Sequence, residues 1–320
     1  MSKRESPNTR DPQSGPVALI AGPTASGKSD LAVNLALMLE KQGRRAVVIN
    51  ADSAQVYSDL QLLSARPSSD EMRGIEHRLF GEWDGAQHCS AADWAAAAKR
   101  EIAALHSEDA VPILCGGTGL YMKTLLEGIA PIPEIDPTVR ELVRSLPVEE
   151  AYCALQREDP ERAAILKPGD SQRIARALEV VRSTGKTLGQ WQAEKSGGIA
   201  DVIELHPLIL LPDREWLYER CDRRFGLMLE HGAIEEVERL LARQLSSDLP
   251  VMRAIGVPEI AAFLRGDTSR NEMIAAGQQA TRNYAKRQYT WFRRQPPEDW
   301  LRQESHNCDI DFIFASLLRN

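Results

Sequence analysis

The chain has 320 residues, of which 43% are hydrophobic, and it carries a formal net charge of −7 with a pI near 5.5. This length allows one sizeable core together with a second unit, and the acidic balance excludes a protein that binds nucleic acid over its whole surface. Any RNA site must therefore be a local patch.

The five cysteines are scattered and form no C-x-x-C pair, which argues against a zinc site and against a disulfide framework. No apolar run reaches the length that spans a membrane, and the polar start of the chain lacks the apolar segment of a signal peptide. We therefore expect a soluble cytoplasmic protein without membrane contact. Residues 1–15 are predicted to be disordered, and no obligate protein partner is evident.

Strands alternate with helices along the first part of the chain. Short apolar runs predict strands at 17–21, 46–50 and 111–115, and helical patterns occupy 28–41 and 91–105. Such alternation predicts an α/β fold, in which a P-loop NTPase-like parallel sheet is flanked by helices.

The strand signal disappears between 131 and 205, where helical stretches replace it. We predict an inserted helical domain there, so that the P-loop catalytic core comprises 16–130 and 206–320. A further strand is expected at 207–211. The clearest later helices are predicted at 215–230, 233–243 and 271–294.

The segment between the first strand and the first helix fits the phosphate-binding pattern G-x-x-x-x-G-K-[ST]. It consists of Gly22, Pro23, Thr24, Ala25, Ser26, Gly27, Lys28 and Ser29. The glycines let the backbone curl around phosphate oxygens, Lys28 adds a cation, and Ser29 adds a hydroxyl that can bind Mg²⁺. The motif does not identify the polyphosphate, because ATP and an allylic pyrophosphate both present two linked phosphates.

Two further candidates follow the next two strands of the predicted sheet. Asp52 lies after the second strand, at the carboxyl edge beside the loop, where a carboxylate can hold Mg²⁺ through water or accept a proton. It could also cap the following segment. Thr118 lies in a loop rich in glycine after the third strand, and is a candidate donor unless the glycines only shape a turn.

Six ordered motifs give the sequence a resemblance to the tRNA dimethylallyltransferase family, also called tRNA isopentenyltransferases. The resemblance spans nearly the whole chain. The motifs are GPTASGKS at 22–29, DSAQVY at 52–57, GGTGLYMKTLLEG at 116–128, DSQRIARALEV at 170–180, MRAIG at 252–256 and TRNYAKRQYTWFR at 281–293.

The resemblance implies transfer of the dimethylallyl group of dimethylallyl pyrophosphate to N6 of the adenosine 3′ of the anticodon, with release of pyrophosphate. The modified tRNAs would be those that read codons beginning with U. The diphosphate would occupy the phosphate-binding loop with Mg²⁺ at Ser29. Asp52 is implied as the general base and Thr118 as a hydrogen-bond donor to the bridging oxygen, roles that suit a weakly nucleophilic amine and a departing anion.

The family resemblance also implies which residues contact the anticodon stem-loop of tRNA. They are Asp52, Ser53, Ala54, Gln55, Thr118, Arg140, Gln172, Arg173, Ile174, Ala175, Arg176, Arg253, Ala254, Ile255 and Gly256. The helical insert resembles the part that grips the stem. The chain departs from the family pattern at His77-Arg78, where a second histidine is common, and at Val257-Pro258, where an aromatic and a basic residue are common.

The segment 282–294 carries five cations and no acid, interleaved with aromatic residues. It suits contact with RNA, but a helix with an aromatic core face and solvated charges fits equally well. Within the insert, Arg173 and Arg176 share a helix face and are better RNA candidates. Rival functions for the chain are a P-loop kinase for a small acceptor and a nucleotide-switched binding module. The sequence contains no N-K-x-D motif, which argues against the second of these.

Overall fold

The computed structural model describes residues 15–305 and 307–319, so the predicted disorder at 1–15 lies outside the described residues except at Gly15. The chain divides into two compact units, 1–125 with 200–320 and 126–199. The predicted insert at 131–205 overlaps the second unit, and its bounds differ from those of the unit at both ends.

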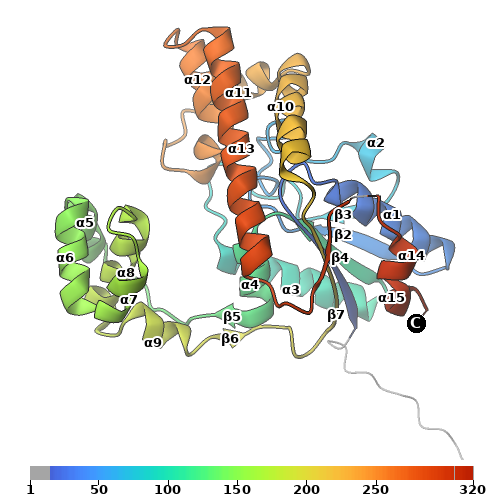
Figure 1. The fold of residues 1–320 in the computed structure, drawn as a ribbon, viewed down its shortest axis with the longest axis horizontal. Coiled ribbons are helices and arrows are strands. Elements are labelled where there is room, and N and C mark those ends of the chain that lie inside the picture. Colours follow the sequence, from blue (N-terminus) through green and yellow to red (C-terminus); the bar gives the residue numbers. More distant parts are fainter. Residues whose placement is uncertain (1–14, 306, 320) are drawn as a thin grey trace, which may run out of the picture. The chain divides into compact units, whose positions relative to one another are not determined.

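The first unit contains a six-stranded sheet in the order β3-β2-β4-β1-β7-β8, in which every neighbouring pair is parallel (Figure 1). The predicted α/β fold with a parallel sheet is therefore confirmed. The strands are β1 (Pro16–Ala21), β2 (Ala46–Asn50), β3 (Glu76–Arg78), β4 (Val111–Gly116), β7 (Glu204–Leu210) and β8 (Leu301–Gln303). The two edge strands, β3 and β8, were not predicted, because each has only three residues and neither contains an apolar run.

Helices cover both faces of this sheet. Ala18 and Ile20 of β1 point toward α1 and toward Leu317 near the end of the chain, and these side chains form one buried cluster. The helix α3 packs against β4 outside that cluster, so the central strands are buried on both faces, as parallel strands require. The helices of this part are α1 (Lys28–Lys41), α2 (Ser69–Met72), α3 (Ala91–Ser107), α4 (Gly119–Glu127), α14 (Ile310–Ile313) and α15 (Ala315–Arg319).

A second group of helices belongs to the same unit and supplies side chains to the carboxyl edge of the sheet. The long helix α13 packs along α10 and begins with a capping box formed by Ser269 and Glu272. These helices are α10 (Arg214–Glu230), α11 (Ala233–Ala242), η1 (Pro250–Arg253), α12 (Val257–Leu264) and α13 (Arg270–Arg294).

The second unit is a small helical bundle with its own core. Val143, Leu155, Ile174 and Leu178 are buried together between its helices. A two-residue antiparallel pair, β5 (Gly128–Ile129) with β6 (Ser196–Gly197), joins the two ends of the unit. The prediction that 131–205 contains no strand is therefore wrong for β6 and for the first two residues of β7. The helices are α5 (Pro137–Ser145), α6 (Val148–Glu158), α7 (Pro160–Ile165), α8 (Ser171–Thr184) and α9 (Leu188–Gln192).

In the described part of the chain, a search for helices able to cross a membrane finds none of sufficient length and apolarity.

Candidate active site

The predicted phosphate-binding loop leaves β1 and enters α1. Gly27 begins the helix with φ 92°, a left-handed conformation that favours glycine, and a side chain at Gly22 would meet the Leu210 carbonyl oxygen at 2.6 Å. Lys28 is only 9% exposed, and its ammonium donates to the Pro23 carbonyl at 3.2 Å. The Ser26 hydroxyl is buried without a hydrogen-bond partner. A buried cation and an unsatisfied hydroxyl in one loop are the groups that a bound phosphate would pair.

Two arginines of α10 reach this loop. Arg224 donates to the Thr24 hydroxyl, and Arg220 donates through Nε to the Ala25 carbonyl at 3.0 Å. Burial lowers the pKa of Lys28, although Asp52 opposes the shift, and burial also lowers the pKa of Arg224. Among the described residues, neither Lys28 nor Arg224 forms an ion pair with a carboxylate, so an anion bound here would stabilise both charges. Sequence reasoning missed Arg220 and Arg224, although their spacing of four puts both on one face of a predicted helix.

Asp52 follows β2 and is 7% exposed. Its Oδ1 accepts from the Ala54 backbone amide at 3.0 Å, which closes a turn rather than capping a helix. Its Oδ2 faces Gly117, where an added side-chain carbon would lie 3.2 Å away. The expected position of Asp52 beside the phosphate-binding loop agrees with the structure, because Asp52 and Lys28 line the same pocket.

Thr118 lies against the segment that follows Asp52. Its hydroxyl accepts from the Ser53 amide at 2.9 Å and donates to the Ser53 hydroxyl at 3.1 Å. The glycines before it do more than shape a turn, because a side chain at Gly116 would lie 2.1 Å from the Ala51 backbone. The two strand ends can therefore approach closely. Thr118 does not belong to the lining of either pocket described below.

Gln288 of α13 links the phosphate-binding loop to the loop that carries Thr118. Its Oε1 accepts from the Thr24 amide at 2.8 Å, and its Nε2 donates to the Gly117 carbonyl at 2.8 Å. The side chain is 6% exposed. Sequence reasoning missed this link, since nothing in the sequence indicates which side chain of a long helix reaches a loop 264 positions away.

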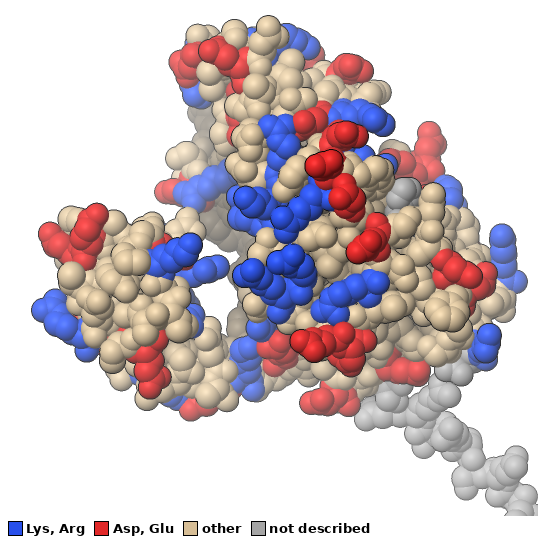
Figure 2. All heavy atoms as spheres, viewed as in Figure 1, with Lys and Arg blue, Asp and Glu red and all other residues tan. Residues whose placement is uncertain are grey.

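The basic aromatic segment at 282–294 has a buried aromatic face and exposed cations, as the structural alternative predicted, and its contact with RNA stays a prediction. Phe292 and Ala285 are fully buried, and the Trp291 ring lies where a side chain at Gly119 would be. The exposed cations face solvent, and Figure 2 shows Lys and Arg side chains gathered over this end of α13. The exposed cations of the segment 282–294 are Lys286, Arg287, Arg293 and Arg294.

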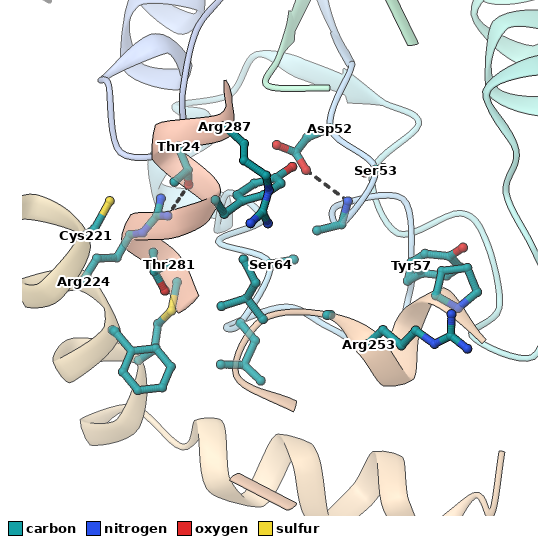
Figure 3. A pocket seen from close by; sticks show the side chains of 18 of the residues that line it. Thr24, Asp52, Ser53, Tyr57, Ser64, Cys221, Arg224, Arg253, Thr281 and Arg287 are labelled. Carbon is teal, nitrogen blue, oxygen red and sulfur yellow. Dashed lines mark hydrogen bonds between the residues drawn. The ribbon is translucent and has the colours of Figure 1, made fainter. Parts of the chain in front are cut away.

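Two pockets meet at Asp52, which lines both together with Thr24, Ser64 and Arg224. The larger pocket, of about 650 Å³, follows the phosphate-binding loop from Thr24 to Ser29 and also contains Gln55 and His77. The smaller pocket, of about 290 Å³, is shown in Figure 3, with Arg224 on one side and Tyr57 and Arg253 on the other. Its remaining lining includes Ser53, Ala54, Leu63, Phe225, Met228, Ala254, Ile255 and Tyr284.

His77, noted as a departure from the family pattern, and Gly256, a predicted tRNA contact, both have contacts within the fold. Nδ1 of His77 lies 2.9 Å from the Ile75 carbonyl oxygen, and burial lowers the pKa of the ring. Gly256 has φ 95° and packs against Leu63, so it supports the smaller pocket without belonging to its lining.

The remaining predicted tRNA contacts belong to the second unit. Arg140 and Gln172 are exposed, whereas Ile174 is buried in the core of that unit, so its side chain is structural. Arg173 pairs with Asp170 at 3.3 Å, and Arg176 pairs with Glu179 at 3.7 Å. Ala175 is partly buried beside them.

A parallel sheet with a phosphate-binding loop after its first strand in the chain, and a carboxylate after the second, defines a P-loop α/β protein. The family model described as IPP transferase matches residues 55–295. The tRNA dimethylallyltransferase of Erythrobacter litoralis is 67% identical over 304 residues, which cover 95% of this chain and 96% of that protein. The tRNA dimethylallyltransferase of Zymomonas mobilis is 55% identical, with 92% of this chain and 93% of that protein covered.

Solved structures agree with these sequence relatives. The tRNA isopentenylpyrophosphate transferase of Bacillus halodurans aligns with a TM-score of 0.67 at 30% identity, covering 95% of this chain and 94% of that one. A eukaryotic dimethylallyltransferase acting on tRNA aligns with a TM-score of 0.73 at 28% identity, covering 87% of this chain and 70% of that one. The chain therefore belongs to the IPP transferase family, the family of the tRNA dimethylallyltransferases.

Proposed function

We propose that this protein transfers a dimethylallyl group from dimethylallyl pyrophosphate to N6 of the adenosine 3′ of the anticodon, in tRNAs that read codons beginning with U. The observation that carries the proposal is the position of Asp52 on the common wall of the two pockets. One pocket offers cations to a pyrophosphate, and the other offers apolar and aromatic walls to a prenyl group and a base. A carboxylate between them is placed to receive the proton of the attacking amine.

The reaction is a displacement at the first carbon of the dimethylallyl group. The N6 lone pair forms the new carbon–nitrogen bond as the carbon–oxygen bond to pyrophosphate breaks, and Asp52 takes the N6 proton. Lys28, Arg224 and the loop amides stabilise the negative charge of the departing pyrophosphate. We assign the pyrophosphate to the loop from Gly22 to Ser29. Thr118 would donate a hydrogen bond to the bridging oxygen. Its hydroxyl must then turn away from Ser53 when substrate binds.

The residues at the loop fit a Mg²⁺ ion bound together with pyrophosphate. Among the described residues, no cluster of three or more His, Cys, Asp and Glu side chains could hold a metal on its own. Mg²⁺, however, usually keeps several waters and binds through one or two protein groups plus substrate phosphates. The Ser29 hydroxyl and the Asp52 carboxylate both border the larger pocket. Mg²⁺ would neutralise phosphate charge there, with Ser29 as its protein ligand.

For the RNA, we assign the anticodon stem-loop to the unit 126–199 and to the smaller pocket. Exposed arginines of the unit, among them Arg140, Arg173 and Arg176, suit phosphate contact, and Arg253 suits contact at the pocket. The adenosine must leave its stack to reach the pocket, which costs little in a single-stranded loop. Because its proposed substrate is tRNA, we also propose a cytoplasmic location for the enzyme.

The test is direct. The protein is incubated with labelled dimethylallyl pyrophosphate, Mg²⁺ and bulk tRNA without ATP, and the RNA is digested to nucleosides. We expect the label in N6-dimethylallyladenosine next to the anticodon. Label confined to free prenyl alcohol, or a strict need for ATP, would reject the proposal and favour the kinase alternative. Asp52→Asn, which keeps the shape of the side chain, is the matched control.

A further inference from the structure

Asn50 is a fully buried amide at the end of β2, two residues before Asp52. Its Oδ1 accepts from the Asp52 backbone amide at 2.8 Å, and its Nδ2 donates to the Asp52 carbonyl oxygen at 3.0 Å. The side chain therefore holds the backbone of residue 52 at both its donor and its acceptor. A buried amide in the last position of a strand otherwise occupied by apolar residues needs such partners, because an unpaired one is costly.

The same amide is anchored on its other side. Nδ2 of Asn50 also donates to the Leu79 carbonyl oxygen at 3.0 Å. Leu79 has φ 63°, a conformation that costs an ordinary residue free energy, and its own amide donates to Glu82 at 2.7 Å. Two side chains thus hold Leu79 in place, one at its carbonyl and one at its amide.

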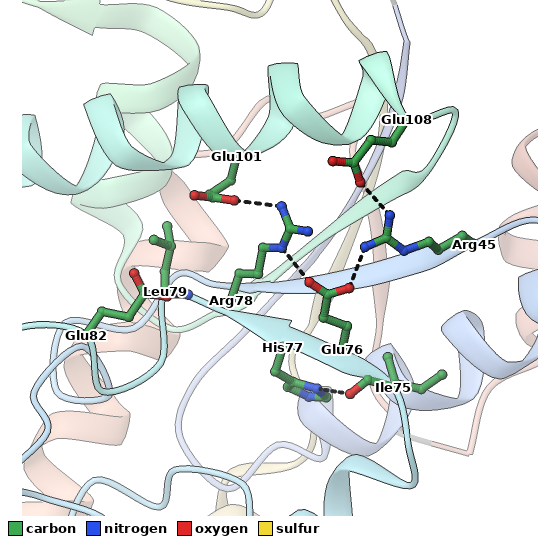
Figure 4. A network of polar contacts seen from close by, with 9 residues as sticks. All are labelled: Arg45, Ile75, Glu76, His77, Arg78, Leu79, Glu82, Glu101 and Glu108. Carbon is green, nitrogen blue, oxygen red and sulfur yellow. Dashed lines mark hydrogen bonds and ion pairs between the residues drawn. The ribbon is translucent and has the colours of Figure 1, made fainter.

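Leu79 follows β3, and ion pairs fix that strand to its neighbours (Figure 4). Arg78 pairs with Glu101 of α3 at 2.8 Å, and Glu76 pairs with Arg45 beside β2 at 2.6 Å. The anchor of the Asn50 amide is therefore a strand end tied to the sheet and to a helix. The hydrogen bonds of the Asn50 side chain to residues 52 and 79 therefore resist movement of residue 52 relative to the sheet.

From these contacts we infer that Asn50 is a positioning residue for Asp52, which holds the carboxylate at the common wall of the two pockets. The inference rests on the proposed function, in which Asp52 accepts the N6 proton. With Oδ1 held by Ala54, a fixed backbone at residue 52 sets where Oδ2 lies. A displacement of about 1 Å in such a group can cost about 100-fold in rate.

The experiment is a double-mutant cycle between Asn50→Ala and Asp52→Asn. The measurement is the single-turnover rate of dimethylallyl transfer at saturating tRNA and dimethylallyl pyrophosphate, with the Kd of each substrate determined separately. We expect Asn50→Ala to lower the rate about 10- to 100-fold in the wild-type background and about twofold or less when Asp52 is already Asn. Both Kd values should stay within about twofold, because Asn50 touches neither pocket.

A merely structural role would behave differently. Leu317→Ala removes a fully buried side chain far from Asp52 in the sequence and outside both pockets, and serves as the control for lost stability. It should lower the Tm without changing the single-turnover rate at a temperature where the variant is folded. If Asn50→Ala folds poorly, Asn50→Ser keeps an oxygen near the Asp52 amide but cannot reach Leu79, and should give a smaller loss of rate with the same dependence on Asp52.

The outcomes separate the two proposals. An unchanged rate in the Asn50 variants, or an equal loss in both backgrounds, overturns the positioning role and leaves the proposed function standing. Full activity of Asp52→Asn alone overturns the general-base role of Asp52, and the positioning role with it.

Discussion

The larger pocket is lined mainly by polar and charged residues, whereas the smaller pocket is lined mainly by apolar and aromatic residues. Four arginines and Lys28 line the first, and the arginines are Arg73, Arg220, Arg223 and Arg224. Leu63, Phe225, Met228 and Ile255 line the second. Charge is thus concentrated where a leaving group would become more negative, and the apolar walls lie where a hydrocarbon and a base would meet. Under the proposed function, a phosphate-binding loop takes part in alkyl transfer because an apolar pocket lies next to it.

The largest effect should come from the wall that the pockets share. Asp52→Ala is expected to lower the single-turnover transfer rate by about 10²- to 10⁴-fold, because the amine loses its proton acceptor. Affinity for tRNA, measured by filter binding, should be nearly retained. Full single-turnover activity in this variant would show that the common wall has no chemical role.

The next effect tests the charged pocket alone. Lys28→Met should weaken binding of dimethylallyl pyrophosphate about 10- to 100-fold by calorimetry, since a charged hydrogen bond is lost. Lys41→Met, at the exposed end of the same helix, is the matched control and should bind normally. Because burial lowers the pKa of Lys28, wild-type affinity should fall as pH rises through a value below the ordinary 10.5. Lys28→Met should lose this alkaline dependence, and an identical pH profile in both proteins would contradict the assignment.

A smaller effect tests the other pocket. Arg253 lines the smaller pocket with its side chain 58% exposed and paired with Asp248. Arg253→Ala should raise the Kd for tRNA about three- to tenfold and leave the Kd for dimethylallyl pyrophosphate unchanged. Arg265 is a similar exposed arginine that pairs with Asp267 at 2.8 Å and lines neither pocket. Arg265→Ala should therefore change neither Kd. An equal Kd for tRNA in the two variants would contradict the assignment of RNA binding to this pocket.

A still smaller effect is expected outside both pockets, in the second unit. Arg176→Ala should weaken tRNA binding about two- to fivefold and lower the salt dependence of binding by about one ion. The variant should fold, because Glu179 keeps Arg144 as a partner at 2.9 Å. Arg157→Ala, another exposed arginine of the unit, is the control for loss of charge. Unaltered tRNA affinity in Arg176→Ala would reject this face as an RNA contact.

The smallest effect concerns stability away from the site. His106 donates from Nε2 to the Pro16 carbonyl at 3.2 Å, while its buried Nδ1 has no partner, and burial lowers the pKa of the ring. The neutral ring is therefore favoured in the folded state, so stability is full above the unfolded pKa near 6.5 and is lost as pH falls through the lower folded pKa. We expect Tm to fall by a few degrees on acidification, since 1 kcal/mol corresponds to about 2–4 °C. His106→Gln should show less of this loss, and an equal loss would exclude His106 as its source.

Local sequence signals were sufficient to predict where the phosphate-binding loop and the Asp52 carboxylate lie in the sheet. Residues 22–29 and Asp52 lie at predicted strand ends, and the parallel order of the strands brings those ends to one edge. Arg224 and Gln288 were not predicted, because each reaches the loop from a helix about 200 or more positions away. The edge strand β3 was missed because pairing with β2, rather than an apolar pattern, makes it a strand.

The Gln288 bridge has a consequence for how the protein is made. Residue 24 emerges from the ribosome long before residue 288, and the two are joined through one side chain. The phosphate-binding loop can curl early, but its tie to the neighbouring loop forms only when α13 has been synthesised and packed. A nascent chain that ends before α13 therefore lacks this link between the two loops, and the proposed substrate site is complete only after the last long helix has been synthesised.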